Sequence, residues 1–337
     1  MQNQVVLITG AAGEIGQALL KTIAADSKSS IITLDLQELP PDLANQSTHI
    51  QGSITDKDLV ADLEAKYAFT RIYHLAALLS TSAERRPSVA HEVNVDASQR
   101  LLELAAHQSE ERNTRVQVIF PSSKAVYGMP DLKTKAAHPS VREDEFTAPT
   151  TLYGANKLMI EMLGRYYSHG YQQLADKEPT RLDFRSLRFP GLISAHTLPT
   201  GGTSDYGPEM LHAAAKGEPY ACFVRPDTTM TFMAMPDAVK AILSLVEAPV
   251  ERLTRVAYNV KGFSLSAEEF RAETLRAFPG AEISYAPDEK RQRIVDSWPM
   301  LIDDTAASTD WGWQPHYDQR LCFDEYLVPN IKARYAG

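Results

Sequence analysis

The stretch Val5-Val6-Leu7-Ile8-Thr9-Gly10-Ala11-Ala12-Gly13-Glu14-Ile15-Gly16 decides the fold of this chain. Its first five residues form a short apolar run, which is typical of a buried parallel strand. A helical pattern follows from Ile15 to Ile23. A strand, a glycine-rich turn and a helix in this order indicate a site for the phosphates of a dinucleotide.

Each glycine of this turn has a place in such a site. Gly10 permits the tight turn, Gly13 lets a pyrophosphate approach the backbone, and Gly16 lets the helix lie near the strand. The N–H groups at the start of the helix, at Glu14 and Ile15, can then bind phosphate. The spacing is G-x-x-G-x-x-G rather than G-x-G-x-x-G, and an ordinary strand-to-helix turn is the alternative.

An acidic residue ends the second expected strand. The run 31–35 is apolar up to Asp35, which comes 19 residues after Gly16. A carboxylate at this place can accept hydrogen bonds from the ribose of adenosine. Its charge repels a 2′-phosphate, and the next residues, Leu36-Gln37-Glu38, contain no arginine to bind one. The sequence therefore favours NAD over NADP.

A third motif, Tyr153-Gly154-Ala155-Asn156-Lys157, places a phenol and an ammonium four residues apart, about one helical turn. Tyrosine is a poor base at neutral pH, and a nearby cation favours its phenolate. Ser122 and Ser123 follow the fifth apolar run, at the end of a strand where open α/β sheets bind ligands. The alternatives are that Tyr153 and Lys157 form an ordinary pair on a helix surface and that the two serines cap a turn. The glycine-rich turn earlier in the chain favours a site for proton abstraction instead.

The alternation of elements predicts a Rossmann-type, doubly wound parallel sheet with a smaller mixed α/β lobe. We expect a nucleotide-binding domain over residues 1–190 together with about 237–260, and a substrate lobe over about 191–236 and 261–337. The long segment 129–151 and the segment 191–206 are interpreted as loops, and 172–181 as a surface insertion. Ser266-x-x-Glu269 resembles a capping box at the start of a helix, and Gly201-Gly202-Thr203 is expected to form a flap with backbone donors for a carboxylate. Expected strands are 5–9, 31–35, 48–51, 72–76, 116–121 and 184–189, and expected helices are 14–25, 56–65, 88–108 and 152–169.

Composition narrows the class of protein. The 337 residues carry a net charge of −9, with no basic stripe to bind nucleic acid. Two cysteines, Cys222 and Cys322, exclude a disulfide framework, and the nine histidines show no metal-ligand spacing, so no metal is expected. No apolar run approaches the ~18 residues of a membrane span. We expect a cytoplasmic protein whose two cysteines stay reduced.

The chain resembles the extended short-chain dehydrogenase/reductase superfamily, whose motifs occur here in the family's order: Gly10-x-x-Gly13-x-x-Gly16, Asp35, His74-Leu75-Ala76-Ala77, Asn94-Val95, Ser122-Ser123-x-x-Val126-Tyr127-Gly128 and Tyr153-Gly154-x-x-Lys157. The resemblance implies NAD bound across the sheet. It also implies that Ser123, Tyr153 and Lys157 are catalytic, with Ser122 as the neighbour that stays open. Further cofactor contacts are implied for Ser53, Ile54, Leu75, Ala76, Ala77, Asn94, Tyr153 and Lys157.

Stretches in the second half resemble a narrower family, the short-chain-type NAD-dependent L-threonine 3-dehydrogenases: Arg188-Phe189-Pro190-Gly191-Leu192-Ile193-Ser194, Gly201-Gly202-Thr203-Ser204-Asp205-Tyr206, Asp296-Ser297-Trp298-Pro299 and Asp310-Trp311-Gly312-Trp313. This resemblance implies oxidation of the C3 hydroxyl of L-threonine to 2-amino-3-ketobutyrate, with tyrosine as the base. Two features depart from the family: Ser53 stands where an aspartate is common, and the 172–181 insertion is long. Substrate contacts are expected from Ser80, Ser123, Tyr153, Gly191, Thr203 and Trp298.

Two other activities remain open. One is the oxidation of another small hydroxy acid, and the other is nucleotide-sugar epimerisation on the same fold. A dehydratase ordinarily has an acidic pair after the catalytic hydroxyl residue, whereas Ser123 is followed by Lys124-Ala125. Apolar residues on more than one face of the expected helices 88–108 and 152–169 favour a homodimer.

Overall fold

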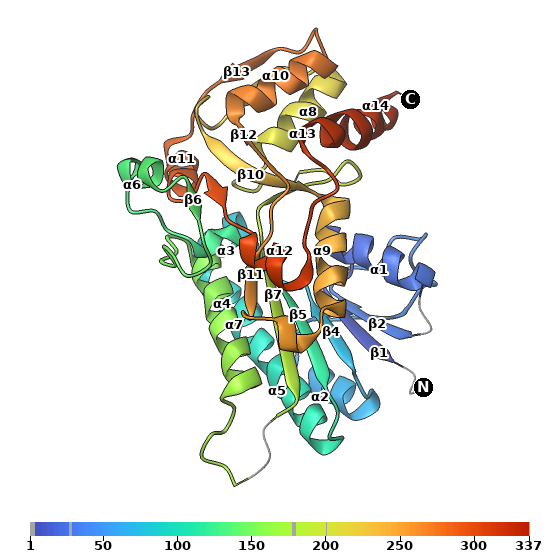
Figure 1. Ribbon diagram of the computed structural model, residues 1–337. Coiled ribbons are helices and arrows are strands. Elements are labelled where there is room, and N and C mark those ends of the chain that lie inside the picture. The colour runs from blue at the N-terminus through green and yellow to red at the C-terminus, as the bar shows by residue number, and fades with distance from the viewer. Residues whose placement is uncertain (1–3, 27–28, 177–179, 200, 337) are drawn as a thin grey trace.

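A parallel sheet of seven strands forms the base of the molecule (Figure 1). The computed structural model describes residues 4–26, 29–176, 180–199 and 201–336. The strand order is β11-β7-β5-β4-β1-β2-β3, and every pairing in it is parallel. The strands are β1 Val5–Thr9, β2 Ser30–Asp35, β3 Thr48–Gln51, β4 Arg71–His74, β5 Val116–Ser123, β7 Leu182–Phe189 and β11 Ala257–Asn259.

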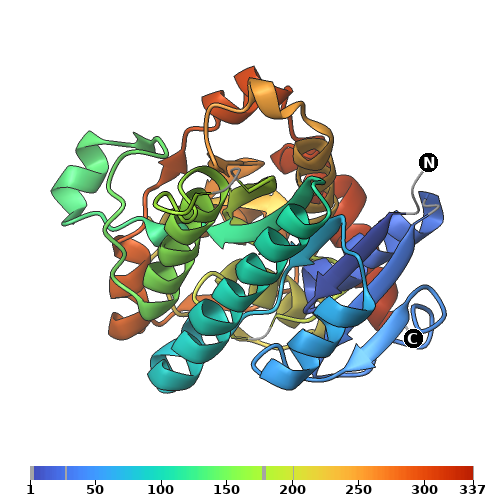
Figure 2. The same cartoon turned by 90° about the horizontal axis from the view of Figure 1, so that it is seen from below.

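Helices cover both faces of this sheet, as the view from below also shows (Figure 2). Successive side chains of a strand point to opposite faces. In β1, Val6 and Ile8 therefore join the core that includes α1 (Glu14–Asp26) and α9 (Met235–Glu247). Leu7, between them, joins the core of the opposite face, which is built with α2 Lys57–Lys66, α5 Ala97–Glu111 and α7 Leu152–His169. The prediction of a doubly wound sheet is confirmed.

A smaller mixed lobe lies beyond the carboxyl ends of the strands (Figure 1). Its main sheet has the order β12-β10-β8, formed by Phe263–Ser266, Thr229–Ala234 and Gly191–Ile193. A second, two-stranded sheet pairs β9 (Tyr220–Cys222) with β13 (Ile283–Tyr285). The helices of this lobe include α8 Tyr206–Lys216, α10 Ala267–Ala277, α11 Glu289–Asp296 and α14 Val328–Tyr335. Of these, α8 packs against β9, α10 against β12, and α14 against α8. The capping box expected at Ser266 and Glu269 is present at the start of α10.

Some segments are more ordered than the sequence indicated. The expected loop 129–151 contains α6 (Leu132–Ala137), which begins because Asp131 accepts a hydrogen bond from the Thr134 N–H at 2.7 Å. It also contains β6 (Ser140–Val141), which pairs with β14 (Leu301–Ile302) far along the chain. The expected loop after Pro190 begins with β8, whose partner is β10. Pairing between distant segments produces these elements, and local patterns do not report it.

The expected helix 88–108 is helical throughout but not uniform. It consists of α4 (Pro87–His91), a π-helical turn (Glu92–Asp96) and α5. π-Helical turns are often found at functional sites. Here the turn carries Asn94, which contacts the loop after β4.

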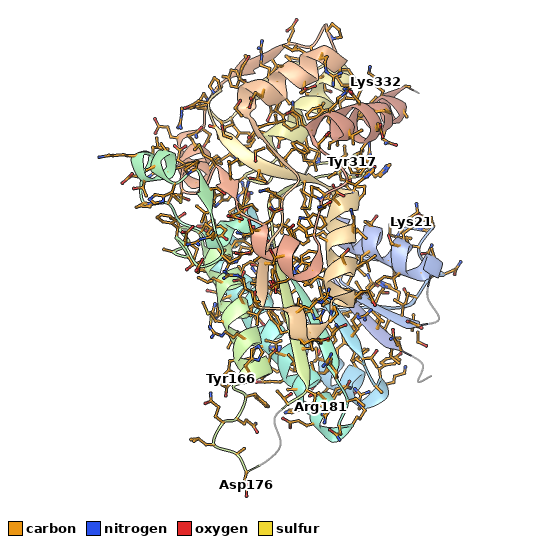
Figure 3. The ribbon with its side chains drawn as sticks, in the orientation of Figure 1. Lys21, Tyr166, Asp176, Arg181, Tyr317 and Lys332 are labelled. Carbon is orange, nitrogen blue, oxygen red and sulfur yellow. The ribbon has the colours of Figure 1, made fainter. Side chains whose placement is uncertain are left out.

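The polar insertion after α7 projects away from the rest of the molecule. In Figure 3, Tyr166 lies near the end of α7 and Asp176 at the tip of the projection. Leu174 within it is fully exposed. Residues 177–179 of the insertion lie outside the described residues. Among the helices of the described residues, none has the length and apolar character to cross a membrane.

Candidate active site

The glycine-rich turn has a backbone that side chains would obstruct. Gly10 has φ +69°, and a Cβ there would lie 2.5 Å from the Ala76 backbone nitrogen. A Cβ on Gly16 would collide with the Gly10 carbonyl oxygen, so α1 can lie this close to β1 only with glycine. Gly13 is exposed at the bend between them. The turn thus presents bare backbone at the start of α1, as a phosphate site requires.

Asp35 is fixed directly beside this turn. Its Oδ2 accepts a hydrogen bond from the Ala12 N–H at 2.9 Å, and its Oδ1 accepts one from the Gln37 N–H at 3.0 Å. These bonds join the end of β2 to the glycine-rich turn. The carboxylate is only partly buried, so it remains accessible to a ribose hydroxyl.

Glu14, at the start of α1, reaches the smaller lobe. Its carboxylate accepts a hydrogen bond from the Thr197 hydroxyl. Part of the side chain is exposed, yet desolvation by the protein around the carboxyl raises its pKa. Glu14 therefore connects the two parts of the molecule through its side chain, while the backbone N–H groups of Glu14 and Ile15 remain the expected phosphate donors.

The loop after β4 lies against the glycine-rich turn. The Leu75 N–H donates to the Thr9 carbonyl at 3.0 Å, and Ala76 touches Gly10. Asn94 shapes the next residues, because its side chain accepts from the Leu78 N–H at 2.7 Å and donates to the Leu78 carbonyl at 3.0 Å. These contacts indicate that Asn94 holds the loop that contains Leu75, Ala76 and Ala77.

Ser53 and Ile54 follow β3 at the same edge of the sheet. The Ser53 hydroxyl is 2.8 Å from the Thr55 hydroxyl, and Ile54 is buried in the core under α2. Ser53 is half-buried and close to the surface, whereas Ile54 mainly packs.

Tyr153 and Ser123 are brought together because α7 starts close to β5. Thr151 caps α7 by accepting the Gly154 N–H at 3.1 Å. A Cβ on Gly154 would collide with the Ala125 carbonyl oxygen, so glycine allows α7 to approach the chain just after Ser123. The Ser123 hydroxyl then lies close enough to the Tyr153 phenol to lower its pKa, but burial has the larger effect and raises that pKa to about 12.

Lys157 lies one turn further along α7 and is buried. Its ammonium donates to the Pro121 carbonyl at 2.6 Å and lies 4.3 Å from the ring centre of Phe120 and 5.6 Å from that of Tyr153. Burial lowers the pKa of Lys157 to about 7. We expected this cation to lower the pKa of Tyr153. Burial instead raises that pKa, because desolvation disfavours the charged form of both groups.

The structure separates the roles of Ser122 and Ser123. Ser122 is buried and donates to the carboxylate of Glu161. Glu161 in turn forms a buried ion pair with Arg188, with 2.6 Å between Oε2 and Nη2. Ser122 is therefore part of a structural network between α7 and β7, whereas Ser123 contacts Tyr153 and accepts the Ala125 N–H at 3.2 Å.

Two of the expected substrate residues meet at the start of α3 (Ser80–Arg85). The hydroxyls of Ser80 and Thr203 are 3.5 Å apart. The loop that carries Thr203 is held by Thr81 and Arg291, which each donate to the Gly201 carbonyl at 3.2 Å. The Gly202 N–H, expected to be free for a ligand, donates to Asp205 at 2.7 Å.

Gly191 and Trp298 belong to the wall of the smaller lobe. Gly191 lies against the Phe232 ring, which a Cβ would approach to 3.0 Å. Trp298 is 4% exposed, and its Nε1 has no hydrogen-bond partner within the described residues. Sequence reasoning missed Lys124, a buried lysine whose ammonium lies 5.0 Å from the Trp298 ring centre. Its place directly after Ser123 was visible in the sequence, but its burial was not.

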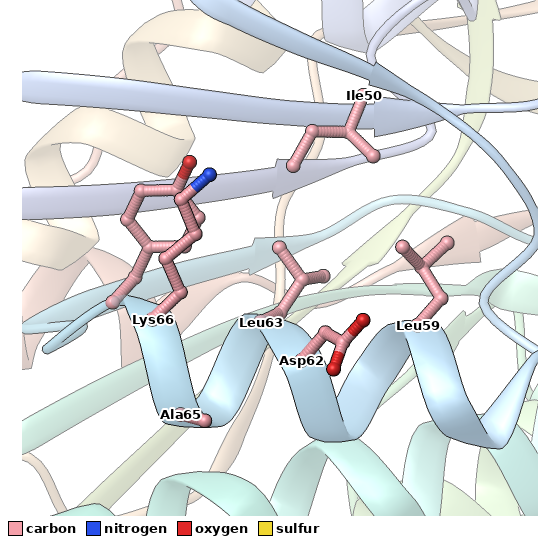
Figure 4. Close-up of a pocket in the computed structure, with 7 residues that line it drawn as sticks. Ile50, Leu59, Asp62, Leu63, Ala65 and Lys66 are labelled. Carbon is pink, nitrogen blue, oxygen red and sulfur yellow. The ribbon is translucent and has the colours of Figure 1, made fainter.

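A surface hollow between β3 and α2 is separate from this site (Figure 4). Leu59, Asp62 and Leu63 of α2 face Ile50 across it, with Lys66 at one end. None of its lining residues belongs to the expected site. The strand ends and the smaller lobe, rather than this hollow, bring the candidate residues together.

This arrangement fits known proteins. The chain belongs to the NAD-dependent epimerase/dehydratase family, whose model matches residues 6–260. The mitochondrial L-threonine 3-dehydrogenase of Bos taurus is 32% identical over 317 residues, which are 94% of this chain and 80% of the bovine protein.

Solved structures agree over nearly the whole length. A GalE-like L-threonine dehydrogenase from Cupriavidus necator in its holo form is 34% identical with a TM-score of 0.83, and the match covers 98% of this chain and 99% of that one. A monomeric L-threonine 3-dehydrogenase from a metagenome in its apo form is 32% identical with a TM-score of 0.85, with the same coverage of both chains. The fold and the superfamily implied by the sequence are thereby confirmed.

Proposed function

We propose that this protein oxidises the C3 hydroxyl of L-threonine to 2-amino-3-ketobutyrate with NAD as the hydride acceptor. The observation that carries the proposal is the close approach of the Tyr153 end of α7 to the chain just after Ser123, at the same ends of the parallel strands as the glycine-rich turn. The bovine relative and the two solved structures, at 32–34% identity, are named L-threonine dehydrogenases, which supports the substrate.

The residues present fit a bound NAD. The bare backbone at Gly10, Gly13 and Gly16 and the N–H groups of Glu14 and Ile15 would hold the pyrophosphate, and Asp35 the adenosine ribose. The nicotinamide, when bound in its oxidised form, accepts the hydride and brings a positive charge. Contacts along the rest of the cofactor are proposed for Ser53, Ile54, Leu75, Ala76, Ala77, Asn94 and Lys157.

The chain's own residues have three tasks in this proposal. Tyr153 accepts the proton of the substrate hydroxyl, for which its phenol must first ionise. Ser123 holds the hydroxyl in line by hydrogen bonding. Lys157 lies one helical turn after Tyr153 and can donate hydrogen bonds. Its positive charge, when it is protonated, favours the phenolate of Tyr153. Most of the rate gain then comes from positioning the reacting atoms at about 3–3.5 Å.

The substrate pocket is proposed to include Ser80, Thr203, Gly191 and Trp298. Ser80 and Thr203 offer paired hydroxyls, and Trp298 with Phe232 beside Gly191 closes the apolar side. A pocket with few polar groups and an apolar wall suits a small amino acid.

A direct assay separates this proposal from its alternatives. NADH formation is followed by absorbance with L-threonine, L-serine, allo-threonine and 3-hydroxybutyrate. We expect the highest kcat/KM with L-threonine. A preference for 3-hydroxybutyrate would favour the hydroxy-acid alternative, and no NADH with any of them would favour an epimerase, which has no net redox change.

The assembly and the two-part organisation remain part of the proposal. Met159, Met162 and Tyr166 of α7 are exposed and apolar, which supports pairing of two copies through this helix. The metagenome relative is named monomeric, so sedimentation at several concentrations is the test, and a monomer throughout would overturn the dimer.

We also retain the proposed NAD-binding part, 1–190 with about 237–260, the substrate lobe over the remainder, and a cytoplasmic location.

A further inference from the structure

Lys124 is a buried cation without a matching anion. It opens the 3-10 helix Lys124–Val126 directly after Ser123 and is 3% exposed. Its ammonium lies 3.2 Å from the sulfur of Met230, 5.0 Å from the ring centre of Trp298 and 5.9 Å from that of Phe232. Within the described part of the chain, no carboxylate lies within ion-pair distance of it.

Burying the Lys124 ammonium among these groups costs the folded protein free energy. A thioether is a weak acceptor, and aromatic rings replace only part of the lost hydration of an ammonium. Burial, with a smaller effect from the nearby charge of Lys135, accordingly lowers the pKa of Lys124 to about 7. Buried lysines are almost always paired, so an unpaired one beside a proposed active site points to a ligand that completes the pair.

The surroundings of Lys124 are rich in donors and poor in acceptors. The Trp298 indole N–H is buried and has no hydrogen-bond partner within the described residues. Lys135, on α6, is a second buried lysine, but its ammonium donates to the Val295 carbonyl at 3.0 Å and the nearby Asp296 carboxylate favours its charged form. A buried ammonium without an anion and an indole N–H without a partner together produce a local environment that favours an anion.

The position relative to the proposed site is also suitable. Lys124 follows Ser123, the residue proposed to hold the reacting hydroxyl. The Phe232 ring lies beside both the Lys124 ammonium and Gly191. In L-threonine, the carboxylate carbon is separated from C3 by only one other carbon. A substrate whose hydroxyl is bound at Ser123 therefore places its carboxylate a short distance from the start of the 3-10 helix, and Trp298, an expected substrate contact, lies beside the Lys124 ammonium there.

We propose that Lys124 binds the carboxylate of the substrate, with the Trp298 indole N–H as a second donor, and so selects hydroxy acids over alcohols that lack a carboxylate. This inference rests on the proposed function, because it assigns the substrate's carboxylate within the same site. It makes Lys124 a specificity-determining residue.

The test compares two substrates in the full-length protein and its Lys124→Met variant. L-Threonine carries the carboxylate, and 1-aminopropan-2-ol has the same hydroxyl and amine without it. We expect Lys124→Met to lower kcat/KM for L-threonine about 100-fold, mainly through KM, because a buried charge pair is lost. For 1-aminopropan-2-ol we expect a change of less than about 3-fold, since no pair exists to lose.

Two further readouts separate recognition from a structural role. Replacing an unpaired buried cation by an apolar side chain of similar length should leave the melting temperature unchanged or raise it. Butyrate, which has a carboxylate but no hydroxyl, should inhibit the wild type competitively, and its inhibition constant should rise in Lys124→Met. The matched control is Lys135→Met, another buried lysine, for which we expect any change in kcat/KM to be similar for the two substrates, so that the wild-type preference for L-threonine is kept.

Equal losses with both substrates in Lys124→Met, an unchanged inhibition constant for butyrate, or a loss of the preference for L-threonine in Lys135→Met as large as in Lys124→Met would overturn the assignment of Lys124. The proposed function would survive these results if the wild type still oxidised L-threonine. Absence of NADH formation by the wild type with L-threonine would instead overturn the proposed function itself, and the role of Lys124 with it.

Discussion

Tyr153 and Lys157 lie one turn apart on α7, and burial affects their charges in the same way. It raises the pKa of the phenol to about 12 and lowers that of the ammonium to about 7. Both shifts oppose the charged forms that proton abstraction by Tyr153 uses. Positive charge and hydrogen-bond donors beside the phenol favour its phenolate, so we expect proton abstraction to depend on the bound ligands.

Replacing Tyr153 by phenylalanine tests this role. We expect Tyr153→Phe to lower kcat by about 10³-fold, because a general base contributes 10²- to 10⁴-fold, while NAD binding stays nearly unchanged. In the wild type, kcat/KM should rise with pH on the alkaline side, since the phenolate fraction increases as protons are removed. Stopped-assay pH profiles and NAD titration measure both.

Tyr166 supplies the control, because it lies on the same helix but is exposed and outside the site. Tyr166→Phe should retain the wild-type rate and pH profile. A Tyr153→Phe protein with near-wild-type turnover would exclude this phenol as the base.

The two adjacent serines should respond differently to replacement by alanine. Ser123→Ala removes the hydroxyl that lowers the pKa of Tyr153 and is proposed to hold the substrate, and we expect a loss of about 10²-fold in kcat with little change in stability. Ser122→Ala leaves the buried Glu161 carboxylate with one donor fewer, and we expect it to lower the free energy of unfolding by about 1.5–3 kcal/mol. Kinetics and urea unfolding of both variants distinguish the roles, and exchanged outcomes would reassign the catalytic hydroxyl to Ser122.

At the scale of elements, His74 ties two strands to a helix beside the site. Its Nδ1 lies 2.8 Å from the Thr9 hydroxyl of β1, and its Nε2 lies 2.7 Å from the Ser98 hydroxyl of α5. Burial, with a smaller effect from Lys157, lowers the pKa of His74 from 6.5 to about 3. The ring is therefore neutral in the folded protein and protonates on unfolding over that range of pH.

This difference predicts how stability depends on pH. Between about pH 6.5 and 3 the unfolded chain binds one more proton at this position, so stability is lost as pH falls. One such proton contributes a slope of ~1.4 kcal/mol per pH unit. In His74→Gln, we expect a shallower dependence than in the wild type, measured by urea unfolding from pH 7 to pH 5. Identical slopes in the two proteins would contradict a neutral buried His74.

The elements built from local pattern were predictable from the sequence. The strands around β1 alternate between two cores, and Gly10 and Gly16 occupy turns that admit no side chain. In contrast, β6 and β8 were expected to be loops, because each is a strand only through a partner distant in the chain, β14 or β10. The π-helical turn at Asn94 was also missed, since its reason is a contact with the loop at Leu78.

At the scale of the whole molecule, the proposed site lies where the sheet meets the smaller lobe. The sequence indicated Ser123, Tyr153 and Lys157 because they belong to elements whose order is set by the parallel sheet. It indicated Ser80 and Thr203 only through a resemblance, and the structure shows that their hydroxyls lie 3.5 Å apart. Lys124 was not found, because its burial depends on Trp298 and Met230, which come from distant parts of the chain.

The central claim is that hydride passes from C3 of L-threonine to the nicotinamide held at the strand ends. L-Threonine with deuterium at C3 tests it most directly, by mass spectrometry of the NADH formed. We expect one deuterium in each NADH molecule. NADH that forms from this substrate without deuterium, or a failure to form any NADH, would contradict the account.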